Sequence, residues 1–121
     1  MDTIDPKIKV EYVEDAVVVT PLLEKILEQG DIQAMQDSIM PLIDENQGIK
    51  LVIDFSNVEF LSSSVLGLLI KISKKVYEKA GDLRLCNISV KIDEIFKITR
   101  LDKVFQISPD KDSAIWSLKQ S

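Results

Sequence analysis

Histidine is absent from the 121-residue chain, and cysteine occurs once, as Cys86. These shortages exclude a His-based triad, a Cys–His nucleophile and zinc sites built from the two residue types. A disulfide framework is also excluded, and a lone thiol suits a reducing cytoplasm. No glycine-rich phosphate loop of the Walker or dinucleotide type is present. We therefore predict a cytoplasmic protein without a metal, a cofactor or enzymatic activity.

Long apolar runs and an excess of basic residues are also missing. The longest apolar stretches cover five or six residues, against the roughly 20 that span a bilayer. Fifteen Lys and Arg against twenty Asp and Glu leave a formal charge of -5, which argues against binding a nucleic-acid backbone. The length predicts a single domain over residues 1–121, with a core at about 7–118 and a loose leader at 1–6. Membrane insertion and nucleic-acid binding are not expected.

The first half of the chain predicts a hairpin, a helix and a buried strand. Apolar and polar residues alternate over 8–12, and a β-branched run at 16–20 follows the polar turn Glu14-Asp15. Asp31 is predicted to cap a helix that is kinked or restarted at Pro41. Residues 51–55 are apolar except Asp54, typical of a central strand, and residues 56–61 are predicted to form a loop. The predicted helix stripe is Ile32, Met35, Ile39 and Ile43.

The second half continues the alternation of strand and helix. A long helix is predicted from the serines at 62–64 to about Ala80, then a strand at 83–88 and a short helix capped by Ser89. A last strand at 104–107 and a helix starting at Ser108 complete the chain. We expect Trp116 to anchor that helix by packing. The order predicts an α/β domain whose mixed central sheet of about four to five strands is packed by about four helices.

Ser62, Ser63 and Ser64 are the most informative feature, because they lie where a loop enters a helix. Free amides and the positive end of the helix dipole favour negative charge there. A phosphoserine would be tolerated and would add about -1.5 to -2 charge to the surface. The structural alternative is that serine is a preferred N-cap residue, so the three secure the helix start.

The helix that follows the serines is apolar nearly all round in its first two turns. Six of the eight residues from Val65 to Ile72 are apolar, more than one core-facing stripe requires. This end is either buried on several sides or presents an apolar patch to a partner. Gly67 permits close approach of another backbone. The candidate partner interface is Ser62, Ser63, Ser64, Val65, Leu66 and Gly67.

Two other residues, Asp54 and Cys86, carry potentially reactive groups. Asp54 resembles the phosphoacceptor of a response-regulator receiver, but the acidic pair and the late lysine of that site have no match, which favours a structural role. Cys86 lies among Leu83, Leu85 and Ile88, which favours an inert core thiol over a redox sensor.

The segment LVIDFSNVEFLSSSVLGLL at 51–69 resembles the STAS family, which includes anti-sigma factor antagonists and domains of sulphate transporters. The segment ITRLDKVF at 98–105 is similar to a second block of that family. The resemblance covers roughly residues 7–118 and implies a STAS-like fold. Two positions depart from the pattern, because Ser62 stands in place of an aspartate and Val65 in place of a glycine.

The resemblance implies a bacterial regulator of transcription that works by partner switching. In such antagonists the unphosphorylated protein binds an anti-sigma factor that is also a serine kinase. Phosphorylation of the serine at the position of Ser63 blocks binding, and a serine phosphatase restores it; Ser64 and Ser62 are weaker candidates. The alternative is a phosphorylation-independent scaffold or accessory subunit of a signalling or lipid-transport assembly, which the two departures favour.

Overall fold

The computed structural model describes residues 7–120, so the predicted leader at 1–6 lies outside the described residues. The described chain begins with the predicted hairpin, in which β1 (Ile8–Val13) pairs antiparallel with β2 (Ala16–Pro21). The turn between them places Glu14 at φ 55. Every residue of β2 is buried, because strands pair with both of its edges and helices cover both of its faces.

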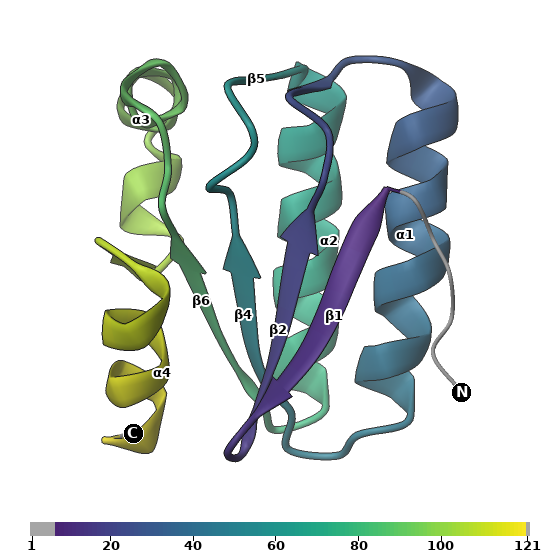
Figure 1. Ribbon diagram of the computed structural model, residues 1–121, viewed down its shortest axis with the longest axis vertical. Helices are drawn as coiled ribbons and strands as arrows, with labels where there is room; N and C mark the ends of the chain where they lie inside the picture. The colour runs from purple at the N-terminus through teal and green to yellow at the C-terminus, as the bar shows by residue number, and fades with distance from the viewer. Residues whose placement is uncertain (1–6, 121) are drawn as a thin grey trace.

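The central sheet has the strand order β1-β2-β4-β6-β7. β4 (Lys50–Asp54), β6 (Asp82–Cys86) and β7 (Ile107–Ser108) run parallel to β2, and only the β1–β2 pair is antiparallel. The predicted mixed sheet of an α/β domain is therefore confirmed. The carboxyl ends of the parallel strands lie at the same end of the sheet, and the loops that follow them gather there (Figure 1).

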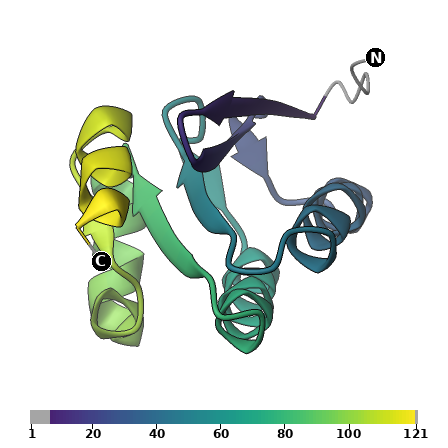
Figure 2. The ribbon, with the colours of Figure 1, turned by 90° about the horizontal axis from the view of Figure 1, so that it is seen from below.

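Helices cover both faces of the sheet (Figure 2). α1 (Gln29–Asp44), α2 (Ser63–Glu78) and α3 (Val90–Thr99) contribute to the larger core, whereas α4 (Lys111–Lys119) covers the opposite face. Within residues 7–120, no helix has the length and apolar character needed to cross a membrane. The smaller core beneath α4 consists of Ala16, Val18, Val52, Cys86, Ala114, Ile115 and Leu118.

Ion pairs join α4 to the hairpin at the other end of the sequence. The Lys111 ammonium lies 3.4 Å from the Glu11 carboxylate, and Lys119 pairs with Glu14. Beneath the helix, the buried Arg84 donates to the Ser117 hydroxyl over 2.8 Å. The last helix is thus held by polar contacts at its margins and by apolar packing beneath it.

A second, two-stranded sheet was not predicted. β3 (Lys25–Ile26) pairs parallel with β5 (Phe60–Leu61), which lies inside the predicted loop at 56–61. Strands of two residues carry no detectable alternation, so only the tertiary pairing defines them. This small sheet fixes the path of the chain directly before α2.

The start of α1 differs from the prediction. Its N-cap residue is Glu28, without a side-chain cap, and Asp31 lies in the first turn, where its carboxylate pairs with Lys7 at 2.6 Å. The helix is continuous through Pro41 rather than restarted there. Pro41 is exposed, so the helix carbonyl that loses its donor faces water.

The C-terminal segment also departs from the prediction in three places. The expected strand at 104–107 begins only at Ile107, after a 3₁₀ helix at Leu101–Lys103. The cap of α4 is Asp110 rather than Ser108, and its carboxylate accepts from the Ser113 amide over 2.8 Å. The Trp116 prediction was wrong, since its side chain is 64% exposed.

The predicted Ser89 cap of α3 is confirmed, with the Ile92 amide 3.2 Å from its hydroxyl.

Candidate functional site

The candidate site begins where β4 ends. The buried Asp54 carboxylate accepts from the Ser56 amide and from the Asn87 side chain, both over 2.9 Å. The next amide, of Phe55, donates to the Cys86 carbonyl over 3.0 Å. These bonds fasten the ends of β4 and β6 together, which matches the predicted structural role of Asp54.

The loop from Asp54 to α2 is held against β3. The Glu59 amide donates to the Glu24 carbonyl over 2.8 Å, and the Ser62 amide donates to the Ile26 carbonyl over 3.0 Å. Two-residue pairing together with these bonds leaves little freedom for the segment. The three serines therefore have defined and different environments.

Ser62 is the N-cap residue of α2, but its side chain makes no capping hydrogen bond. Its hydroxyl oxygen is buried and has no hydrogen-bond partner within residues 7–120. Ser63 and Ser64 are both exposed, and their amides have no acceptor in the described part of the chain. Ser63 and Ser64 are therefore accessible to a modifying enzyme, whereas the Ser62 hydroxyl is not.

The apolar start of α2 is buried rather than presented to solvent. Val65 and Leu66 are 0% and 8% exposed, and the next apolar residues of the helix also enter the core. Gly67 is exposed, and a Cβ placed on it would meet nothing within 4 Å. Within the predicted interface, the exposed residues are Ser63, Ser64 and Gly67, while Val65 and Leu66 anchor the helix beneath them.

Three exposed apolar side chains lie beside the loop that leads to the serines, and residue patterns did not single them out. Leu22, Leu27 and Val90 are 45%, 52% and 74% exposed. Each directly follows a residue that is hydrogen-bonded to the loop between β4 and α2, so all three lie near that loop. We call this region the serine-end surface: Leu22, Leu27, Phe60, Ser63, Ser64, Gly67 and Val90.

Charged groups flank the serine-end surface. The Lys91 ammonium lies 4.2 Å from the centroid of the Phe60 ring, and that of Lys25 lies 5.6 Å away, close enough for cation–π attraction. The exposed Glu24 and Glu59 flank the same strands. The loop is therefore bordered by both signs of charge.

Cys86 does not form a second reactive site. Cys86 is fully buried, and burial, aided by the carboxylates of Asp54 and Asp110, raises the pKa of its thiol to about 12. The thiol is thus the inert core group that was predicted. Within residues 7–120, no three potential metal ligands lie together.

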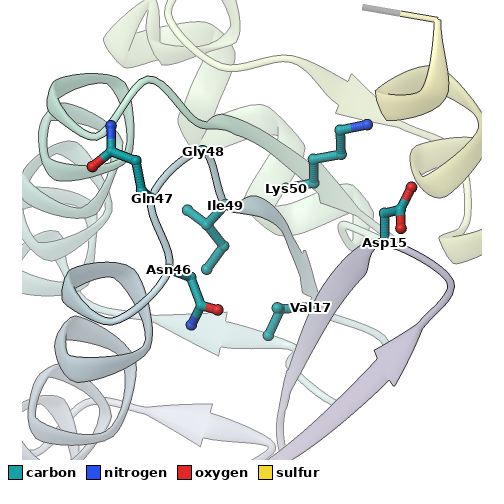
Figure 3. Close-up of a pocket in the computed structure, with 7 residues that line it drawn as sticks. All are labelled: Asp15, Val17, Asn46, Gln47, Gly48, Ile49 and Lys50. Carbon is teal, nitrogen blue, oxygen red and sulfur yellow. The ribbon is translucent and has the colours of Figure 1, made fainter.

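A shallow hollow of about 330 Å³ lies at the opposite end of the sheet (Figure 3). The loop from α1 to β4 and the hairpin turn form its walls, and its charged groups are Asp15 and Lys50. It contains none of the predicted site residues, which occupy the other end of β4.

The comparisons with known proteins agree with the geometry. A family model of the STAS domain matches residues 11–114. The chain belongs to the STAS domain family. The anti-sigma-B factor antagonist of Bacillus subtilis is 28% identical over 81 residues, which cover 67% of this STAS chain and 72% of the relative.

Solved structures of the same type superpose on this STAS domain. An anti-sigma-factor antagonist (STAS) domain protein from Planctomyces limnophilus gives a TM-score of 0.85 at 23% identity, over 93% of this chain and 97% of the other. The Bacillus cell fate determinant SpoIIAA in its phosphorylated form gives 0.69 at 19% identity, over 89% and 96%. The fold and these relatives support a regulatory module that acts by binding other proteins.

Proposed function

We propose that this STAS domain is a non-catalytic partner-switching regulator of transcription in the bacterial cytoplasm. Its unphosphorylated serine-end surface binds an anti-sigma factor that is also a serine kinase. Phosphorylation of Ser63 releases that partner, and a serine phosphatase reverses the change. The observation that carries the proposal is that Ser63 is exposed at the start of α2 while the Ser62 hydroxyl is buried. Support also comes from the relatives named as anti-sigma factor antagonists and from the phosphorylated form of SpoIIAA.

The start of α2 suits a phosphorylated side chain. Ser63 is the first residue of the helix, and no acidic residue lies in the first turn. The unbonded amides of Ser63 and Ser64 and the helix dipole favour negative charge at this position. A phosphate therefore leaves the fold intact and acts on what binds the surface.

The same phosphate opposes binding of a partner. It adds about -1.5 to -2 charge to the serine-end surface. A partner that covers Leu27 and Val90 would have to desolvate this charge. A hundredfold loss of affinity corresponds to about 2.7 kcal/mol, which is within the cost of one unpaired interfacial charge.

The test combines phosphorylation with binding. The protein is incubated with ATP and each candidate anti-sigma kinase of its own genome, and mass spectrometry locates the phosphate. We expect phosphate on Ser63 in the natural sequence and none in Ser63→Ala, with Ser64→Ala as the matched control. Calorimetry should show that Ser63→Ala binds the kinase as the natural protein does and that Ser63→Glu binds at least about a hundredfold more weakly.

The opposite results identify the second candidate function. No phosphate with any kinase, and equal affinities for Ser63→Ala and Ser63→Glu, would reject the phosphoserine switch. The observation that favours a phosphorylation-independent scaffold is Ser62, whose buried, unpartnered hydroxyl stands where the family has a carboxylate. Co-purification from native extract would then recover subunits of a transporter or signalling assembly rather than a sigma-regulating kinase.

A further inference from the structure

β1 is an outer strand of the central sheet, and its free edge has a defined set of hydrogen-bonding groups. The Lys7 carbonyl accepts from the Leu22 amide over 2.9 Å. Because the bonds of an antiparallel ladder alternate, the odd residues of β1 direct their backbone groups toward β2. The amides and carbonyls of Ile8, Val10 and Tyr12 therefore point outward, and they have no partner within residues 7–120.

The side chains of this edge are divided between the two faces of the sheet. Val10 and Tyr12 are 38% and 67% exposed and share one face, as the alternation of a strand requires. Lys9 and Glu11 lie on the other face and form an ion pair at 3.1 Å. An outer strand is normally protected by charge against pairing with another chain, but here the two charges have opposite sign and are two residues apart.

This spacing makes the strand complementary to itself. If two copies of β1 pair antiparallel about a two-fold axis at Val10, Lys9 of each copy lies opposite Glu11 of the other. The same register places Ile8 opposite Tyr12 and lets the three outward-pointing residues form the hydrogen-bonded pairs.

The neighbouring registers that keep the hydrogen-bond alternation are disfavoured by charge. A register with the two-fold axis at residue 9 places Lys9 of one copy opposite Lys9 of the other. A register with the axis at residue 11 places Glu11 opposite Glu11. Like charges directly opposite each other destabilise a strand pair. The charge pattern thus selects the register centred on Val10.

We propose that two copies of this chain associate through β1, which joins two five-stranded sheets into one continuous ten-stranded sheet. The paired edge shares no residue with the serine-end surface, so the serine-end surface of each copy lies outside the proposed interface. The inference rests on strand geometry and is independent of the proposed switch at Ser63.

Sedimentation of the natural protein from about 10 μM to about 1 mM should show a monomer–dimer equilibrium. In Lys9→Glu, a glutamate at position 9 lies opposite Glu11 of the other copy, and in Glu11→Lys, Lys9 lies opposite a lysine at position 11. Because like charges then face each other, each variant alone should dimerise at least about tenfold more weakly than the natural protein. An equal mixture of the two should regain the dimer, because every opposing pair is then of unlike sign. Circular dichroism confirms that each variant is folded, and Lys74→Glu on α2 is the charge-change control.

Amide hydrogen exchange of the natural protein supplies a test without a substitution. On going from dilute to concentrated solution, the amides of Ile8, Val10 and Tyr12 should gain protection, while Lys9 and Glu11, already bonded to β2, should change little. A monomer at the highest concentration overturns the proposal. So does a dimer that leaves the three amides unprotected, or a mixture of the charge variants that stays monomeric.

Discussion

Replacing Gly67 with alanine is expected to stabilise the fold and to weaken binding of a partner at the serine-end surface. Gly67 is the fifth residue of α2, and an added Cβ meets nothing within 4 Å. Alanine in an exposed helix interior is more favourable than glycine by about 0.5–1 kcal/mol. With about 2.1 cal/mol/K of unfolding entropy per residue, this gain raises the Tm by about 2–4 °C.

Urea unfolding followed by circular dichroism measures the first effect. The midpoint should rise while the slope m stays constant, because the surface exposed on unfolding is unchanged. A lower midpoint would refute the description of position 67 as open space. Gly81 provides the contrast, since its Cβ would lie 2.4 Å from the Ile49 carbonyl oxygen. Gly81→Ala should therefore lower the stability by about 1–3 kcal/mol.

Calorimetry with the cognate kinase measures the second effect. If Gly67 lies in the interface, a methyl group there holds the partner away from the helix, and the affinity of Gly67→Ala should fall about tenfold or more. Lys74→Ala, on an exposed part of α2 beyond the serine-end surface, is the matched control. A stabilised variant with unchanged affinity would place the interface elsewhere.

Three further predictions concern the remainder of the fold. The Cys86 thiol should resist a thiol reagent at pH 8 until urea is added. The pKa of this thiol is about 12 in the folded protein and near 9 in the unfolded chain, so the unfolded chain loses the proton first as pH rises above 9. The free energy of unfolding therefore falls with pH in this range, and Cys86→Ala should lack this pH dependence. Asp110→Ala should lower the urea midpoint at pH 7, whereas Asp110→Asn retains a cap. The hydrogen bond from Ser113 lowers the pKa of Asp110, so its contribution is present above pH 3.8 and is lost as pH falls through the folded pKa. Acrylamide should quench the fluorescence of Trp116 almost as strongly in the native protein as in urea, because the ring is 64% exposed.

The elements that could be predicted from sequence are those whose patterns are local. The hairpin follows from alternation over 8–12, and β4 from an apolar run bounded by a polar loop. β3 and β5 were missed because their pairing joins residues 35 positions apart, Lys25 with Phe60. Trp116 was predicted to pack against the fold, but it is exposed. The apolar residues of α4 lie on more than one side of the helix, and the sequence does not show which side faces the sheet.

The position of the candidate site could be predicted from the sequence, but which residues are exposed around it could not. The serines at the entrance of α2 could be found from their motif and from the preference of helix starts for negative charge. Whether Val65 and Leu66 faced a partner or the core depended on how α2 packs, and the structure buries both. The exposed Leu22 directly follows β2 and the exposed Val90 begins α3, so only the fold brings them beside the loop that leads to the serines.

The attachment of α4 to the first hairpin has a consequence for synthesis of the chain. The ion pairs Lys111–Glu11 and Lys119–Glu14 join residues 100 and 105 positions apart. On the ribosome, the hairpin, β4 and β6 emerge well before the helix that covers them. Until α4 follows, Val18, Val52 and Cys86 form an apolar stripe open to water. Emergence of α4 from the ribosome is therefore the step that closes this face, and a nascent chain stalled before it is a natural client for a chaperone.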